Sequence, residues 1–408
     1  MTTHTHPAPK HTRLLQYLLA TLATLGPFSI DTYMPSFPAM GAALAASPLQ
    51  IQHTLTAYLL AFAAMMLFHG ALSDAYGRRP IVLISLLLYT VASIGCAFTT
   101  DIHALLVLRA LQGISAGAGL VIGRAMIRDL YEGAEAQRLM SRVTMIFGIA
   151  PAIAPIIGGW LHTWFGWRSI FVFLALIGVG MLAVCARYLP ETLPRTARES
   201  FHPVPLFANY RKVGSHPEFQ WLSLAVGLNF AGFFLYIASA PVFILQHLQL
   251  DEHEFGWLFI PAVSGIVLGA FISGRLAGKC SLRSTVQYAF MISFAAATLN
   301  VLYNLTPLPG LPSVLIIMLY ATGMSLAMPS ISLLNLELYP RNRGMVSSLQ
   351  GFIHTMGSTL AAGLLSPWLA HSPLLLALGM LGCLLGGGLA WLIYLRVAQK
   401  SAEHDRGS

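Results

Sequence analysis

GALSDAYGRRP, residues 70–80, is a short polar connection between two long apolar stretches. The preceding stretch covers roughly 50–72 and the following one roughly 80–99, and each is long enough to span a membrane as a helix. The connection ends in the pair Arg78 and Arg79, and basic residues favour the cytoplasmic side of a membrane. The stretch therefore predicts two antiparallel spanning helices that turn at a cytoplasmic face.

The composition extends this prediction to the whole chain. Of its 408 residues, 56% are hydrophobic and only 9% are charged, whereas soluble proteins carry about 25% charged residues. The four cysteines are scattered, three in apolar runs and Cys280 in a basic loop, so we expect neither a disulfide nor a metal site. No small-residue cleavage site follows the first apolar run, so we expect this run to be retained as a helix.

Twelve apolar stretches are long enough to span a bilayer. The predicted spans are roughly 14–36, 50–72, 80–99, 103–127, 138–162, 168–189, 218–246, 255–277, 284–304, 311–336, 343–368 and 373–396. The apolar runs do not alternate with polar residues, which excludes an outer-membrane barrel and favours helices throughout. The predicted fold class is an all-α membrane protein.

The basic residues fix the orientation of these spans. Almost all of the 23 Lys and Arg lie in the N-terminal tail or on every second connection after it, whereas the opposite connections hold only Arg168. Basic residues accumulate on the cytoplasmic side, so both termini are predicted to be cytoplasmic. The net charge of +8 is then a signal of topology and requires no nucleic-acid partner.

One long polar connection divides the twelve spans into two groups of six. The predicted organisation is a cytoplasmic N-terminal tail (1–13), a six-helix bundle (14–189), a cytoplasmic linker (190–217), a second six-helix bundle (218–396) and a cytoplasmic C-terminal tail (397–408). The two groups resemble each other weakly in their spacing of small residues. Secondary transporters of the major facilitator type have two such pseudo-symmetric bundles, with the substrate near the midplane between them, but periodicity alone leaves other polytopic membrane proteins open.

Three motifs carry a resemblance to the major facilitator superfamily. GALSDAYGRRP resembles the signature between its second and third helices, LRALQGISAGAG (108–119) resembles its fourth-helix motif, and GIAPAIAPIIGGWL (148–161) resembles the fifth-helix motif of proton antiporters. Glycines permit a tight turn and close helix packing, an acid can meet a helix N-terminus in the other half, and arginines can pair with acids. The predicted gating residues are Gly70, Asp74, Gly77, Arg78, Arg79, Asp129, Pro155, Gly158 and Gly159. The alternative for the first motif is a basic loop that only sets topology.

IDTYMPSFP, GALSDAYGRRP, RAMIRDLYEG and APIIGGW together resemble the bicyclomycin- and chloramphenicol-resistance (Bcr/CflA) family of twelve-helix drug:proton antiporters. This resemblance covers the N-terminal half closely, and the C-terminal half mainly in its layout. It implies drug efflux in exchange for protons in a bacterial inner membrane, and it leaves the substrate open.

Asp31 is the only acid well inside a predicted helix, because Glu337 lies beside the basic loop after Pro340. A carboxyl in a medium of low dielectric resists ionisation, while a nearby guanidinium such as that of Arg109 favours the charged form. Acids inside membrane helices are costly and usually functional, so Asp31 and Arg109 are the predicted proton-coupling residues. The alternative is an acid whose hydrogen bonds serve only packing.

A second set of residues is predicted to line a substrate cavity. It contains aromatic side chains with a few polar groups, which suits amphiphilic drugs, although each residue alone is equally compatible with helix packing. The set is Tyr33, Tyr58, Gln112, Asn229, Phe233, Phe234, Tyr236, Asn335, Gln350 and His354.

These observations predict a monomeric, proton-coupled multidrug exporter whose partners are amphiphilic drugs, protons and membrane lipids. Walker sequences, metal clusters and nucleophile–base arrays are absent from the sequence, so no enzyme activity, metal or cofactor is expected and the proton gradient is the energy source. One alternative is a transporter of a metabolite or amino acid. The other is a membrane sensor without transport, for which the tails and the linker are short.

Overall fold

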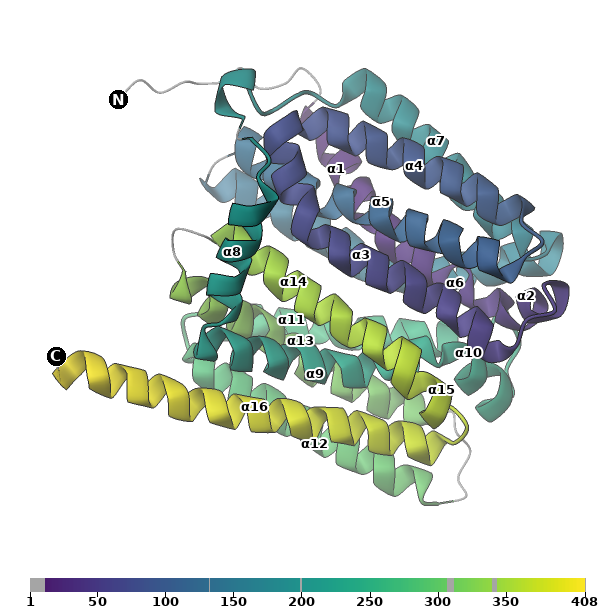
Figure 1. Cartoon of the computed structure of the whole chain (residues 1–408). Helices are drawn as coiled ribbons and strands as arrows, with labels where there is room; N and C mark the ends of the chain where they lie inside the picture. Colours follow the sequence, from purple (N-terminus) through teal and green to yellow (C-terminus); the bar gives the residue numbers. More distant parts are fainter. Residues whose placement is uncertain (1–11, 132, 199, 307–311, 340–342, 408) are drawn as a thin grey trace.

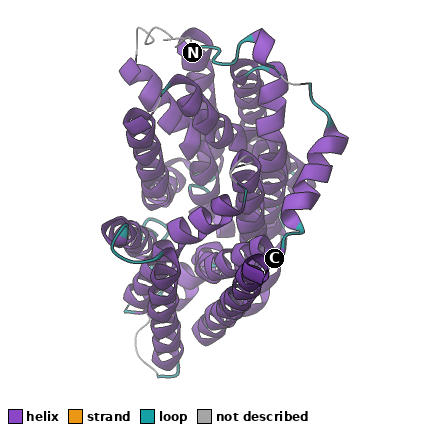
Figure 2. Cartoon of the chain, turned by 90° about the vertical axis from the view of Figure 1, so that its left-hand side faces the viewer, coloured by secondary structure: helices purple, strands orange, loops and turns teal. Residues whose placement is uncertain are grey.

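The computed structural model describes residues 12–131, 133–198, 200–306, 312–339 and 343–407. Most of the predicted N-terminal tail (1–13) and the last residue of the C-terminal tail lie outside the described residues. Within them the chain is helical and contains no strand (Figure 2).

Twelve long helices form the described part, six on each side of a short linker helix, α8 (Pro203–Gly214). The first six are α1 (Thr12–Asp31), α3 (Pro48–Tyr76), α4 (Arg78–Phe98), α5 (Ile102–Leu130), α6 (Gly133–Phe165) and α7 (Arg168–Tyr188). The second six are α9 (Pro217–Ala238), α11 (Gly256–Leu276), α12 (Leu282–Asn304), α13 (Ser313–Leu338), α14 (Arg343–Leu360) and α16 (Pro373–Gly407). By length and composition, nine of these helices in the described chain can cross a membrane. The other three are α1, α6 and α14, in which prolines or polar residues lie among the apolar ones.

The helices of each group of six pack mostly against one another, and the two groups meet along two pairs of helices. In Figure 1 the first group occupies the upper half and the second group the lower half, with α3 beside α14; α6 contacts α11 in the same way. Small residues permit close packing inside each group. A methyl group on Gly113 of α5 would overlap the Tyr58 carbonyl of α3, and one on Gly119 would overlap the Leu22 carbonyl of α1.

Local sequence signals set several helix boundaries. Ser47 and Gln50 form a reciprocal capping box at the start of α3, and the Asp101 side chain accepts a hydrogen bond from a backbone N–H in the first turn of α5. Gly77 separates α3 from α4 with φ of +105°, a conformation that favours glycine. The turn inside residues 70–80 therefore depends on this glycine.

Three predicted spans end earlier than expected, all at the same end of the molecule. The span predicted over 14–36 stops at Asp31 and is followed by η1 (Met34–Ser36) and α2 (Phe37–Ala43). The span predicted over 218–246 stops at Ala238 and continues as α10 (Ala240–Val242) and the π-helical turn η3 (Phe243–His247). The span predicted over 343–368 stops at Leu360, before the π-helical turn η4 (Ala361–Leu365) and α15 (Ser366–Leu369). Prolines 35, 241 and 367 lie in these segments and lack the N–H that a continuous helix needs.

The predicted linker contains η2 (Arg195–Ala197) and α8. The Tyr210 hydroxyl of α8 donates to the Leu67 carbonyl of α3 (3.0 Å), and Phe207 packs edge-on against Phe68. Burial raises the pKa of the Tyr210 phenol, which keeps it a donor. Val213 at the other end of α8 is buried against a cluster that includes residues of α14. The linker therefore contacts both halves, at the end of the bundle where α1 begins and α16 ends (Figure 1), here called the termini end; the opposite end is the distal end.

Candidate functional site

Arg109 of α5 lies at the centre of the first half with no exposed surface. Its guanidinium donates to the Gln112 side-chain oxygen (2.6 Å) and to the Ser29 carbonyl of α1 (2.9 Å). The same group lies over the rings of Tyr33 and Tyr58, with 4.2 Å and 4.5 Å to the ring centres. Cation–π contacts and neutral acceptors therefore compensate this buried charge.

Asp31 is the last residue of α1 and is 4% exposed. No ion pair joins it to a basic side chain in the part of the chain that the structure describes, so the expected pairing with Arg109 is not formed in this conformation. Arg109 is nevertheless bound to the carbonyl of Ser29, two residues earlier on the same helix. Gly158 of α6 packs against the next residue, Thr32, so closely that a methyl group there would overlap the Thr32 carbonyl. The residues on either side of the buried Asp31 thus contact the Arg109 cluster and α6.

Two side chains of α4 complete the polar network and were not predicted from the sequence. Ser93 accepts a hydrogen bond from the Gln112 side-chain amide (2.7 Å), and the Tyr89 hydroxyl lies 2.6 Å from the Ser29 hydroxyl. Tyr89 and Ser93 are four residues apart and face the same side of α4. Their spacing on one face of a spanning helix is the signal that would have identified them.

The three predicted cavity residues of the first half belong to the Arg109 cluster. Tyr33, Tyr58 and Gln112 are fully buried and engaged in packing and hydrogen bonds. In the second half, Tyr236 is equally buried and accepts a hydrogen bond from the Asn300 side chain (2.7 Å). In this conformation these four side chains are therefore parts of two bundle interiors.

The remaining predicted cavity residues lie on α9, α13 and α14: Asn229, Phe233, Phe234, Asn335, Gln350 and His354. The His354 ring lies against Phe230 in a tilted arrangement with 3.7 Å between ring centres, and its Nε2 has no hydrogen-bond partner among the described residues. The buried amide oxygens of Asn229 and Asn335 also lack a partner there, whereas Gln350 donates to Ser332 (2.9 Å). These three atoms are among the buried polar atoms of the second half that have no hydrogen-bond partner in the described chain.

Within residues 70–80, Arg78 binds two acids at the termini end. It pairs with Asp74, four residues earlier, and with Asp129 at the end of α5 (3.2 Å). Asp129 also accepts the Thr192 hydroxyl of the linker (2.7 Å). An acid at this position can meet a helix N-terminus in the other half, whereas in this conformation the described ion pair of Asp74 lies within its own half.

The other predicted residues of this loop also contact the first half and the linker. A side chain on Gly77 would overlap Glu191 of the linker, whose carboxylate accepts the backbone N–H that follows Gly77 (2.9 Å). Arg79 donates to the Ala186 carbonyl of α7 (2.7 Å) rather than to an acid. The Gly70 carbonyl accepts a serine hydroxyl from the next turn of α3 (2.8 Å). The loop of residues 70–80 thus binds the linker to the first half.

At the distal end, α6 contacts the loop before α11. Gly159 of α6 packs against the Glu252 backbone of the second half, where a methyl group would overlap the Glu252 carbonyl. His162, one turn further, lies 3.0 Å from the Glu252 carboxylate. The buried Pro155 precedes these residues by about one turn of α6. Gly159 therefore lies at the boundary between the halves, where the antiporter-like motif predicted a close contact.

Gln52 forms a second inter-half contact at the distal end. Its side-chain nitrogen, on α3, donates to the carbonyls of Ala238 and Ala362, both at 3.2 Å. Ala238 ends α9 and Ala362 lies in the π-helical turn after α14, so one buried amide joins both interrupted helices of the second half to the first half. The bonds of Gln52 and the contacts of Glu252 are here called the distal contact.

Two groups of six helices, with polar side chains buried between the helices of each group, have the architecture of a secondary transporter. The chain belongs to the Major Facilitator Superfamily, whose family model matches residues 19–236 and 222–408. It is a multi-pass membrane protein, and members of this superfamily are in general carriers rather than enzymes.

Individual relatives agree with this assignment. The chain is 32% identical over 354 residues to the uncharacterized MFS-type transporter YdgK of Bacillus subtilis, covering 85% of this chain and 87% of that protein. It is 26% identical over 358 residues to a bicyclomycin resistance protein homolog of Haemophilus influenzae (86% and 90% covered). It is 32% identical over 357 residues to a chloramphenicol resistance protein of Pseudomonas aeruginosa (84% and 80% covered). The resemblance to Bcr/CflA-type proteins that the N-terminal motifs predicted is therefore confirmed.

Solved structures support the fold. A bacterial homolog of the human lysosomal transporter Spinster superposes with a TM-score of 0.70 at 17% identity, over 95% of this chain and 96% of that chain. The predicted fold class, a twelve-helix major facilitator fold, is confirmed.

Proposed function

We propose that this chain exports amphiphilic drugs in exchange for protons. The names of its relatives support drugs as substrates, since they include bicyclomycin, chloramphenicol and multidrug resistance proteins. The two halves alternate in exposing a central site to either side of the membrane. The proton gradient supplies the energy, and the carrier requires no cofactor and no catalytic step.

The observation that carries this proposal is the burial of Asp31 without a basic partner. A charged carboxylate in a protein interior is costly unless it is paired and hydrogen-bonded, so we infer that Asp31 is protonated in this conformation. Arg109 is bound to the Ser29 carbonyl of the same helix, two residues before Asp31, and its guanidinium would favour the charged form of Asp31 if the two side chains approach when the helices move. Asp31 would then take up a proton with one side open and release it, or exchange it for a drug, with the other side open.

The sequence supports the proposed orientation and surroundings of the chain. Basic residues on alternate connections support a bacterial inner-membrane location with both termini and the linker (190–217) in the cytoplasm. The functional unit is one chain in contact with lipids, with two bundles (14–189 and 218–396), a short N-terminal tail (1–13) and a C-terminal tail (397–408) in which α16 continues to Gly407. The loop of residues 70–79 would control the cytoplasmic side, and the distal contact the opposite side.

The test uses purified protein in proteoliposomes with a pH gradient and a panel of amphiphilic drugs that includes chloramphenicol. Asp31→Asn removes the titratable group at nearly constant size, so we expect it to abolish gradient-driven accumulation of drug. Asp101→Asn is the matched control, because Asp101 is exposed and asparagine caps a helix equally well. Full gradient-driven transport by the Asp31 variant would exclude this mechanism, and absence of transport by the wild type for every drug would exclude the proposed substrate class.

A further inference from the structure

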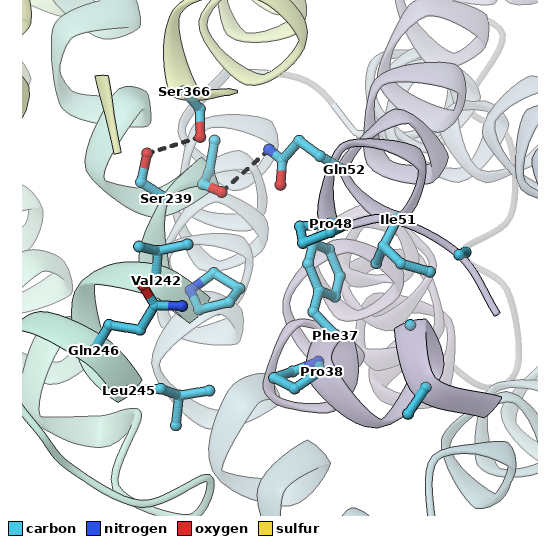
Figure 3. Close-up of a pocket in the computed structure, with 15 residues that line it drawn as sticks. Phe37, Pro38, Pro48, Ile51, Gln52, Ser239, Val242, Leu245, Gln246 and Ser366 are labelled. Atoms are coloured by element: carbon cyan, nitrogen blue, oxygen red, sulfur yellow. Dashed lines mark hydrogen bonds between the residues drawn. The ribbon is translucent and has the colours of Figure 1, made fainter. Parts of the chain in front are cut away.

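A cavity of about 380 Å³ lies between the two halves at the distal end (Figure 3). One wall comes from α2 and the start of α3, with Phe37, Pro38 and Ile51; the other comes from the interrupted end of α9, with Val242 and Leu245. The central residues Asp31 and Arg109 do not line this cavity. The cavity is therefore separate from the Arg109 cluster, and it exists only while the two halves are in contact at the distal end.

The lining of this cavity is apolar, with a few polar groups and no charged side chain. The hydroxyls of Ser239 and Ser366 lie 2.8 Å apart and satisfy each other. The Gln52 nitrogen is used in the distal contact, but its oxygen accepts no hydrogen bond within the described residues and faces the space between the walls in Figure 3. The exposed Gln246 supplies a second amide at the cavity wall.

We propose that this cavity binds an uncharged, drug-sized amphiphile from the distal side. Cavities of this size with an apolar lining and few polar groups are typical of small-molecule sites. The apolar body of the ligand packs between Phe37 and Leu245, and a hydroxyl or amide N–H of the ligand donates to the free Gln52 oxygen. Ions are disfavoured, because no charge in the lining replaces their hydration.

Such a ligand holds the distal end closed. It touches both halves, so it binds the conformation in which the walls meet and loses one wall when they separate. A ligand that binds one of two conformations shifts the population toward it, which here slows the transport cycle. The cavity wall also contacts the Arg109 cluster. Phe37 packs edge-on against Tyr33, with ring centres 4.9 Å apart, and the Arg109 guanidinium lies over the Tyr33 ring.

The test fills the cavity and leaves the distal contact in place. Ala42 is exposed and lines the cavity, so Ala42→Phe places a ring in it; Ala43→Phe is the matched control, because Ala43 is the exposed neighbour that does not line it. Radiolabelled chloramphenicol, an uncharged probe with hydroxyl and amide donors, is measured by equilibrium dialysis against the full chain in lipid nanodiscs. Ala46→Phe fills the same cavity from the next loop and serves if Ala42→Phe does not fold.

We expect the wild type and Ala43→Phe to bind one more chloramphenicol per chain than Ala42→Phe. Equal numbers bound by the wild type and Ala42→Phe, or no binding to the wild type, would overturn the proposal. The inference is independent of the proposed export function: loss of the additional bound molecule is read from binding alone, whereas export is read from the Asp31 transport assay.

Discussion

Replacing Gln52 with leucine should open the distal end. The variant keeps the approximate size of the side chain but removes two buried hydrogen bonds, those from the Gln52 nitrogen to the Ala238 and Ala362 carbonyls. A typical hydrogen bond contributes about 0.5–1.5 kcal/mol net, so the two together stabilise the closed distal end by about 1–3 kcal/mol. This corresponds to a decrease of about 5- to 150-fold in the ratio of closed to open molecules.

Pulsed electron spin resonance on the full chain in nanodiscs measures this ratio. One spin label is placed at Leu49, exposed at the start of α3, and the other at His371, exposed between α15 and α16. The background lacks Cys280 and Cys383, which are partly exposed; Cys96 and Cys185 are buried and remain. The population at the longer label–label distance should increase in Gln52→Leu.

The matched control is Gln246→Leu, because Gln246 is a distal glutamine without an inter-half hydrogen bond in the described chain. Its distance distribution should equal that of the wild type. Identical distributions for Gln52→Leu and Gln246→Leu would refute the reasoning, since the two bonds would then contribute nothing to distal closure.

Two further perturbations test the packing and charge of α6. Gly158→Ala should lower the free energy of unfolding by about 1–3 kcal/mol, as overpacking does, because the added methyl group overlaps the Thr32 carbonyl. The measurement is reversible unfolding in mixed micelles, with Gly148→Ala as the control because Gly148 has open space around it. Equal stability of the two variants would contradict the prediction. Glu252→Gln should increase the population at the longer distance between the same spin labels, because it removes the carboxylate that lies 3.0 Å from the His162 ring across the two halves. An unchanged distance distribution would show that this pair does not contribute to distal closure.

The positions of the helices were predictable because they depend mainly on hydropathy. Apolar runs of about 20 residues determined the positions of all twelve, since backbone groups in lipid must be paired within a helix. The predicted ends of α9 and α14 were wrong, because the π-helical turns η3 and η4 begin with apolar residues that continue the apolar runs of the helices before them. Hydropathy does not distinguish an interrupted helix from a continuous one, and Pro241 and Pro367 were the signals of the change.

The candidate site was predictable one residue at a time, but its contacts were not. Burial of Asp31 and Arg109 follows from their positions inside apolar runs. The acceptor of Arg109, however, is the backbone carbonyl of Ser29, and a sequence pattern does not distinguish one carbonyl from another. The inter-half contact of Gln52 was missed for the same reason, although a glutamine on the buried face of a spanning helix was a usable signal.

The two acceptors of Gln52 are main-chain atoms, and this limits how mutation can adjust the distal contact. Substituting the side chain of Ala238 or Ala362 leaves both carbonyls in place, so on that side only a change in the path of the helix, at the π-helical turn for example, removes an acceptor. A substitution of the donor, Gln52, by contrast removes both hydrogen bonds at once. Selection for faster or slower opening therefore has one direct target, position 52, and we expect adaptive variants at this contact to concentrate there.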